Sequence, residues 1–319
     1  MFFTKAFKGN NAWYMYLVVL LLVFITTQLG GIPFILYKVL SNPETMQQAM
    51  SGAEPDTAAL TAVTGNAELA LMLLAFAAGL GSLFLFARVF QKKSAADITT
   101  GRPRFDWKRF AFGTAVWGAL LLIISGASIL TDDDIVFRFD ATQFFSLALV
   151  GLLLFPFQTG FEEVMFRGYL MQASGLVFRY RWAALLVTSL AFGLMHGANP
   201  EIDTFGFWTA MPQYIIMGLI MGYIAIKDDG LELAFGMHFV NNLLSTLVVS
   251  ADGTVFQTAS LFRDLSPTSS VADTVIMAAA GVVFVYLCNT KYRFLGRVNL
   301  WGRIEKPQVC AVNETEFKE

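Results

Sequence analysis

Long runs of apolar residues dominate the chain, and shorter polar segments separate them. Eight runs are candidates for membrane-spanning helices, because a bilayer core of about 30 Å requires roughly 20 apolar residues in a helix. They cover residues 12–40, 69–90, 110–130, 143–166, 183–197, 209–226, 231–250 and 274–290. Apolar and polar residues do not alternate within the runs, as they would in a β-barrel. We therefore predict an all-α polytopic membrane protein with about eight transmembrane helices.

The first and fifth runs need separate treatment. The first follows Lys5 and Lys8 and in this respect resembles a secretory signal peptide. It is longer than the apolar core of such a peptide, and no pattern of small residues for cleavage closes it. We therefore expect it to be retained as the first span. The fifth run is short, and we expect it to extend back through Trp182.

The composition agrees with this class. Hydrophobic residues make up 56% of the chain and charged residues only 14%, whereas soluble domains carry about 25% charged residues. We expect the lipid bilayer as a partner, and the net charge of -2 gives no reason to expect nucleic acid. The two cysteines, Cys288 and Cys310, are far apart in the sequence, so neither a disulfide framework nor a thiolate zinc site is indicated.

Basic and acidic residues alternate between successive connections. Basic residues gather in the second and fourth connections and after the last span: Arg88, Lys92, Lys93, Arg102, Arg104, Lys108, Arg109, Arg179, Arg181, Lys291, Arg293, Arg297 and Arg303. Acidic residues gather in the first, third and fifth connections: Glu44, Glu54, Asp56, Asp132, Asp133, Asp134, Glu201 and Asp203. With eight spans, the positive-inside bias places both termini in the cytoplasm.

These patterns predict a single integral membrane domain over residues 1–319, without internal repeats. Its motif-bearing core covers about 143–250, and residues from about 302 to 319 are expected to form a flexible tail. Such a multi-pass protein would lie in the inner membrane if the cell is prokaryotic.

Five ionisable residues remain in the apolar part of the chain once those at the span ends are set aside: Glu162, Glu163, Arg167, His196 and His238. Each costs about 2.5 kcal/mol or more at the middle of a bilayer, so residues of this kind mark functional sites by default. The chain has 2 histidines in total, and both belong to this set. We therefore expect these residues to form one site.

Their spacing suggests a different role for each residue. Glu163 and Arg167 are four residues apart, the spacing of an ion pair along one helix face. Glu162 points about 100° away and lacks that partner, which makes it a candidate general base. His238 and Asn242 are one turn apart, and both side chains can donate a hydrogen bond to the same oxygen.

Three motifs summarise these positions: Glu162-Glu163-x-x-x-Arg167, Phe192-x-x-x-His196 and His238-x-x-x-Asn242. Together they resemble the motifs of the CAAX protease and bacteriocin-processing enzyme family, also called the CPBP or Abi family, which includes the CAAX prenyl endopeptidase. They occur in the family's order on the fourth, fifth and seventh predicted spans. The resemblance covers roughly residues 160–245, under a third of the chain.

The resemblance implies an intramembrane endopeptidase of the glutamate type. By motif position, Glu162 would activate a water molecule with the help of His196, and His238 and Asn242 would stabilise the oxyanion. The remaining site residues are expected to support these four: Glu163, Arg167, Phe192 and Asn241. Asn241 precedes Asn242, and only spacing selects the latter. The substrate would be membrane-associated, with a prenylated CAAX protein as one possibility, cleaved near the cytoplasmic face.

Two alternatives stay open. In the first, Glu162, His196 and His238 bind zinc or another divalent metal in a metal-dependent protease, whereas the glutamate-type mechanism needs no cofactor. The His-Glu-x-x-His motif of zincins is absent from the sequence. In the second, the polar cluster belongs to a non-catalytic immunity or scaffold protein or to a proton-coupled transporter. Transporters often carry inverted repeats, and we find none.

Counting residues along the predicted spans raises a difficulty for one shared site. At 1.5 Å per residue, His196 lies roughly 20 Å from the start of its span and His238 roughly 10 Å, while Glu162 lies near the end of its own. A tilted or re-entrant fifth segment would bring the three side chains to one depth.

Overall fold

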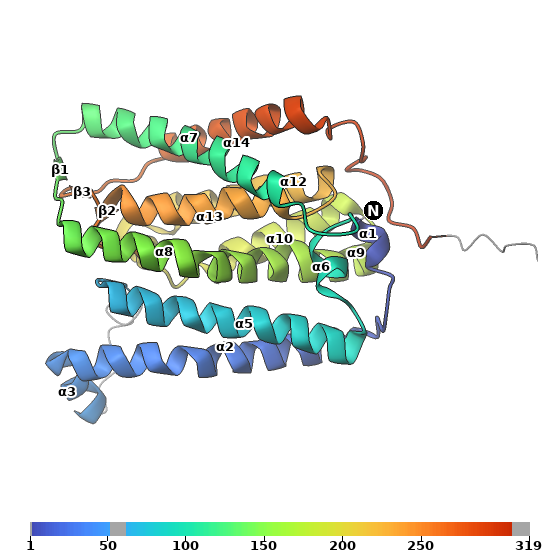
Figure 1. The fold of residues 1–319 in the computed structure, drawn as a ribbon, viewed down its shortest axis with the longest axis horizontal. Coiled ribbons are helices and arrows are strands. Elements are labelled where there is room, and N and C mark those ends of the chain that lie inside the picture. Colours follow the sequence, from blue (N-terminus) through green and yellow to red (C-terminus); the bar gives the residue numbers. More distant parts are fainter. Residues whose placement is uncertain (1, 52–61, 308–319) are drawn as a thin grey trace, which may run out of the picture.

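The computed structural model describes residues 2–51 and 62–307, and almost all of the regular structure in them is helical (Figure 1). The acidic residues Glu54 and Asp56 and the tail from 308 onward lie outside the described residues. The long helices run side by side along one axis. The prediction of an all-α polytopic membrane protein is confirmed.

Each of the eight apolar runs forms helix. The main helical segments are α2 (Trp13–Ser41), α5 (Asn66–Gln91), α7 (Trp107–Thr131), α8 (Ala141–Glu162), the π-helix η1 (Glu163–Leu170), α9 (Met171–Phe178), α10 (Arg181–Met195), α12 (Phe207–Lys227), α13 (Glu232–Leu247) and α14 (Val271–Tyr292). The short helices are α1 (Phe2–Lys5), α3 (Pro43–Ser51), α6 (Ala95–Thr99) and α11 (Pro200–Phe205). As predicted, the fifth run extends back past Trp182.

Six helices in the described part of the chain are long and apolar enough to cross a membrane. The two short ones are α10, with 15 residues, and α13, with 16. At 1.5 Å per residue, each reaches only about 22–24 Å, which is less than the bilayer core. The expected count of eight crossings therefore stays a prediction for these two helices.

A small sheet joins the connections at one end of the bundle. Strand β3 (Phe262–Asp264) pairs antiparallel with β1 (Ile135–Phe137) and parallel with β2 (Val249–Ala251). We call this end the sheet end, and α11 belongs to it because Val255 donates its backbone N–H to Glu201 across 2.8 Å.

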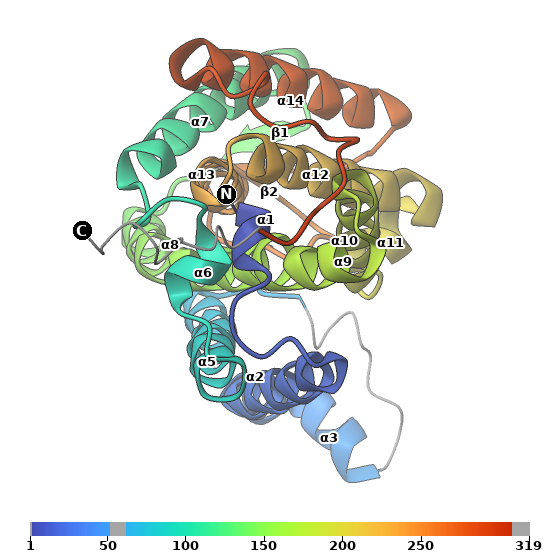
Figure 2. The ribbon, with the colours of Figure 1, turned by 90° about the vertical axis from the view of Figure 1, so that its right-hand side faces the viewer.

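The opposite end, which we call the terminal end, carries the N-terminal segment. Helix α1 packs on α6 and on the turn between α12 and α13 (Figure 2). Phe2 and Phe3 are buried there, and the backbone N–H of Phe2 donates to Asp229 Oδ1 across 2.6 Å. The start of the predicted tail also packs at this end, where Ile304 is buried and its N–H donates to Arg179 O across 2.7 Å.

The fourth predicted span is longer than its apolar run. It was expected to cover 143–166, but the helix continues without a break over Ala141–Phe178, 38 residues in all. Arg167 interrupts the apolar pattern, yet the helix does not end there because Glu163 pairs with its guanidinium inside the bundle. The helix ends before Arg179, which has φ 64, and α10 returns from this turn.

This extension removes the difficulty over depth. Glu162 lies sixteen residues before Phe178, and His196 lies fifteen residues after Arg181. At 1.5 Å per residue, both are therefore roughly 22–24 Å from the turn that joins their helices. The two residues reach the same depth without a tilted or re-entrant segment.

Helix α13, which carries the third motif, packs closely against α7. A Cβ atom at Gly236 would lie 2.2 Å from the backbone oxygen of Phe110, so only glycine fits at this crossing. Thr114 Oγ1 also donates to Gly236 O across 3.2 Å. This contact fixes the position of α13 at Gly236, which lies two residues before His238 and five before Asn241.

Candidate active site

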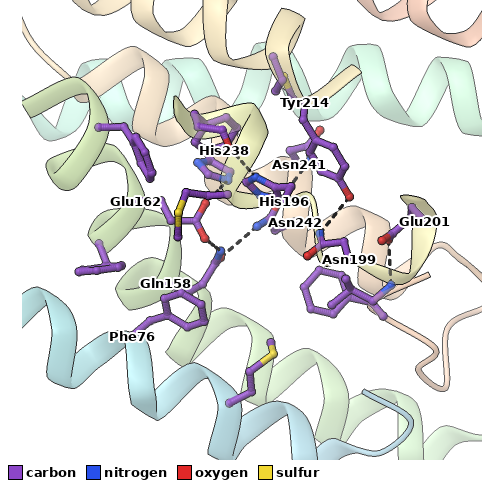
Figure 3. Close-up of a pocket in the computed structure, with 18 of the residues that line it drawn as sticks. Phe76, Gln158, Glu162, His196, Asn199, Glu201, Tyr214, His238, Asn241 and Asn242 are labelled. Atoms are coloured by element: carbon purple, nitrogen blue, oxygen red, sulfur yellow. Dashed lines mark hydrogen bonds and ion pairs between the residues drawn. The ribbon is translucent and has the colours of Figure 1, made fainter. Parts of the chain in front are cut away.

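The structure brings most of the predicted site residues around one cavity of about 450 Å³ (Figure 3). The wall of the cavity includes Glu162, Phe192, His196, His238, Asn241 and Asn242. Glu163 and Arg167 lie behind this wall, where both side chains are only 1% exposed. The expectation of a single site is therefore met in the positions of the side chains.

The helix that carries the first motif changes its geometry at the motif itself. Helix α8 ends at Glu162, and the π-helix η1 begins at Glu163. Wide turns of this kind are frequent at functional sites. Both carboxylates then face the same ring, because His238 lies within 3.5 Å of Glu162 and 2.8 Å of Glu163.

Glu163 is the hub of a buried ion network. Its Oε1 accepts a hydrogen bond from Arg167 Nη1 across 2.8 Å, as the four-residue spacing predicted, and lies 2.8 Å from Nδ1 of His238. The guanidinium of Arg167 also stacks 4.0 Å from the ring centroid of Phe192. Phe192, the first residue of the second motif, therefore packs directly against the first motif.

His238 spans the two carboxylates. Because Nδ1 faces the Glu163 carboxylate, it is the protonated nitrogen of the ring, and Nε2 points the other way. Nε2 lies 3.5 Å from Glu162 Oε2, and this oxygen has no hydrogen-bond partner among the described residues. One ring thus connects the buried pair to the carboxylate that lines the cavity.

A chain of hydrogen bonds holds the other oxygen of Glu162. Gln158 Nε2 donates to Glu162 Oε1, and Gln158 Oε1 accepts from Asn242 Nδ2 across 3.0 Å. Asn242 Oδ1 accepts from Asn241 Nδ2 across 3.2 Å, and Asn241 Oδ1 accepts from Trp117 Nε1 across 3.2 Å. The Asn241 amide thus joins Trp117 to Asn242, whereas the Asn242 amide bonds Gln158 and through it is linked to Glu162.

Sequence reasoning missed Gln158. Ionisable side chains were taken as the sign of a site because they are costly in lipid, and Gln158 is a neutral amide. The available signal was position, because Gln158 lies one helical turn before Glu162 inside an apolar run. A polar amide at that spacing from a buried carboxylate is a candidate hydrogen-bond donor to it.

His196 enters the cavity from the end of α10. Its Nδ1 lies 2.8 Å from the backbone oxygen of Phe192, so Nδ1 donates and Nε2 is left to face the cavity. Tyr214 stacks on the imidazole with ring centroids 4.3 Å apart, and Asn199 Nδ2 donates to the Tyr214 hydroxyl across 3.1 Å. Among the described residues, no hydrogen bond or ion pair joins His196 directly to Glu162.

One further carboxylate lines the cavity at the sheet end. Glu201 Oε1 accepts the backbone N–H of Val255, and Glu201 Oε2 has no hydrogen-bond partner among the described residues. Burial raises the pKa of Glu201, while the hydrogen bond from Val255 opposes that rise.

The donor set for a metal is incomplete. Among the described residues, no three side chains of His, Cys, Asp or Glu are arranged as ligands of one ion. The predicted ligands Glu162, His196 and His238 therefore do not form such a set. Of the four tetrahedral positions that zinc usually takes, this arrangement supplies too few.

Comparison with known proteins agrees with the motifs. Residues 143–244 match the family described as type II CAAX prenyl endopeptidase Rce1-like. The chain is also 26% identical over 259 residues to the Bacillus subtilis (strain 168) protein named "Uncharacterized protein YyaK", across 80% of this chain and 84% of that protein. The family match contains all eight predicted site residues and indicates a CAAX-type intramembrane peptidase. The resemblance is thus confirmed: residues 143–244 are similar to the type II CAAX prenyl endopeptidase Rce1-like family.

Proposed function

We propose that this protein is an intramembrane endopeptidase of the glutamate type that hydrolyses a peptide bond in a membrane-associated segment. The observation that carries the proposal is the position of His238 between Glu163 and Glu162. Two carboxylates and two imidazoles around one cavity form a set for general acid–base chemistry.

Glu162 is the general base in this proposal. Its Oε2 has no hydrogen-bond donor among the described residues, and in this proposal it receives a proton from the attacking water. Nε2 of His196 accepts the second hydrogen of that water, because Nδ1 is engaged by Phe192 O. The water oxygen then attacks the carbonyl carbon, and Glu162 later returns the proton to the leaving amine nitrogen.

His238 and Asn242 stabilise the oxyanion. In this proposal His238, which lies between Glu162 and Glu163, acts with both ring nitrogens as donors. In that form Nε2 donates a hydrogen bond, and Nδ1 keeps its bond to Glu163. Asn242 Nδ2 has a second hydrogen besides the one directed at Gln158. Each donor of this kind contributes about 10²–10³ in kcat.

The decisive variant is Glu162→Gln, which keeps the shape of the side chain and removes the base. We expect cleavage of a fluorogenic peptide panel by the purified protein in detergent to fall at least about 100-fold. The matched control is Glu68→Gln, since Glu68 is also buried but pairs with Lys38 outside the cavity. Equal turnover by wild type and Glu162→Gln would reject the proposal, provided that both unfold at the same temperature.

A further inference from the structure

Much of the lining that the described residues give the cavity lies between Glu162 and the sheet end. Met72 and Phe76 line it from the first half of α5, and Tyr214 and Met217 line it from the first half of α12. Both of these helices start at the sheet end (Figure 1). Among the helices that run the other way, α10 contributes His196 from its end, and α13 contributes His238 and Asn242 from its middle.

Two connections at the sheet end complete the wall. Asn199 and Glu201 contribute from the segment between α10 and α12, and Val255 and Phe256 from the segment between α13 and α14. Met195 is 70% exposed and forms an open edge of the cavity at the last residue of α10. A substrate can therefore reach the carboxylates along this half of the bundle.

The terminal end is closed by charged side chains that pair with one another. Arg102 Nη2 lies 3.0 Å from Asp228 Oδ2, and Arg102 Nη1 lies 2.9 Å from Glu232 Oε2. Arg109 also pairs with Asp228, and both acidic side chains are 0% exposed. Breaking a buried pair of this kind costs about 3–5 kcal/mol, so a peptide does not enter between α12 and α13 from this end.

The two ends also differ in charge. Described basic residues at the terminal end include Lys92, Arg104, Arg179, Arg293 and Arg297. At the sheet end the described basic residues are Lys38, Arg138 and Arg263, and two of them pair with carboxylates. The described acidic residues there are more numerous: Glu68, Asp132, Asp133, Asp134, Asp140, Glu201, Asp203, Asp252, Asp264 and Asp273. The positive-inside bias therefore assigns the terminal end to the cytoplasm.

We propose that the cavity opens on the non-cytoplasmic side and takes its substrate from there. The inference rests on the proposed peptidase function and names its substrate class: a peptide segment in the outer half of the bilayer, rather than a cytoplasmic lipidated protein. The residues near the opening fit a segment with apolar side chains, since Phe34, Met72, Met195 and Phe256 line this part of the cavity.

Orientation is tested without activity, by labelling single cysteines in intact cells with a membrane-impermeant maleimide. Asp203→Cys reports on the sheet end and Arg104→Cys on the terminal end, and both positions are exposed. The natural thiols are removed as Cys288→Ala and Cys310→Ser. We expect labelling of Asp203→Cys in intact cells and of Arg104→Cys only after permeabilisation. The reverse pattern would overturn the proposal.

Substrate access is tested with the Asp203→Cys protein in liposomes of mixed orientation. Impermeant labelling gives the fraction of molecules whose sheet end faces outward. An acylated, quenched fluorescent peptide is added outside, and turnover is compared before and after detergent. We expect the ratio of the two rates to equal the labelled fraction, and a ratio equal to its complement would overturn the proposal. Absence of turnover even in detergent would instead reject the peptidase function, while the cell labelling would still identify the exposed end.

Discussion

Glu163 and His238 are 75 residues apart in the sequence, yet Oε1 and Nδ1 lie 2.8 Å from each other. The same oxygen receives the guanidinium of Arg167, so one buried carboxylate fixes both a cation and the orientation of an imidazole. The motif-bearing helices η1 and α13 are joined at this point. In the proposed mechanism stability and catalysis therefore depend on the same atom, and variants can separate them.

The first prediction concerns this buried pair. Glu163→Gln leaves the guanidinium of Arg167 buried without its hydrogen-bonded carboxylate, so we expect the free energy of unfolding to fall by about 3–5 kcal/mol. The double variant Glu163→Gln/Arg167→Met should recover most of that stability but not the activity, because His238 still lacks its carboxylate. Thermal unfolding and peptide turnover in detergent measure the two effects. A single variant as stable as wild type would contradict the prediction, and Arg263→Met, at a partly exposed pair, should cost less than about 1 kcal/mol.

The second prediction separates the two asparagines. Asn242→Ala removes a proposed donor to the oxyanion and should lower kcat about 100-fold or more with little change in KM. Asn241→Ala removes a residue whose amide only positions its neighbour, and its effect on kcat should be smaller. Steady-state kinetics of both variants decide the matter. If Asn241→Ala is the more damaging change, the assignment based on spacing is wrong.

The third prediction concerns the ring stacked on His196. Tyr214→Phe keeps the stack and should leave kcat within about twofold of wild type. Tyr214→Leu removes it and should lower kcat up to about 10-fold, because an aromatic pair contributes about 0.5–1.5 kcal/mol. The measurement is kcat over a range of pH, since a freed imidazole would also shift the profile. Equal kinetics for the two variants would exclude a positioning role for the ring.

The fourth prediction is a dependence of stability on pH. Burial lowers the pKa of Lys93 from 10.5 to about 8, while Asp97 opposes the shift. Lys93 is 1% exposed, and its Nζ donates to Ala6 O across 3.0 Å. A depressed pKa means that the stability linked to this group is present above 10.5 and is lost as the pH falls through about 8.

Wild type should therefore gain stability relative to Lys93→Met between pH 8 and pH 10.5, by up to about 3 kcal/mol. Unfolding temperatures of both proteins across that range measure the gain. Lys108→Met, at an exposed lysine, serves as the control and should show no such trend. A constant difference between wild type and Lys93→Met would show that the ammonium is not desolvated in the folded protein.

The fifth prediction concerns metal removal. The glutamate-type proposal needs no metal, and the described side chains do not supply three ligands for one ion. Activity should therefore remain within about twofold after dialysis against 1,10-phenanthroline or EDTA. Loss of activity that zinc restores would favour the metal-dependent alternative with Glu162, His196 and His238 as ligands.

Hydropathy was sufficient to predict the helical fold, because backbone groups in lipid must be satisfied within a helix. All eight runs became helices, but the end of the fourth was wrong. The run was closed before Arg167, whose charge is neutralised by a partner one turn away. A count of charged residues treats such a side chain as solvated, although the bundle buries it.

Which residues belong to the candidate site was easier to predict than how their side chains are arranged. Ionisable residues are so costly in lipid that Glu162, Glu163, His196 and His238 could be selected from composition and position alone. The hydrogen bond from Gln158 and the stacking of Tyr214 depend on which helices are neighbours, and the sequence does not state this. The closed terminal end was missed for the same reason, since Arg102 and Asp228 each look like ordinary loop residues.

The wide turns of η1 also set how tolerant this helix is to a change in length. In a π-helix each N–H reaches back five residues, so the segment holds about one residue more than an α-helix of similar height. Removal of one residue from Glu163–Leu170 would let the ladder close as a regular α-helix, still apolar and still spanning. Because the wide turns absorb the additional residue, the helix beyond the deletion would keep nearly the same face toward the bundle, and the change would fall on side chains within the segment, such as Glu163 and Arg167. The protein would still insert and fold, but Glu163 and Arg167 would contact different neighbours. The additional residue in η1 therefore sets the direction of these two side chains.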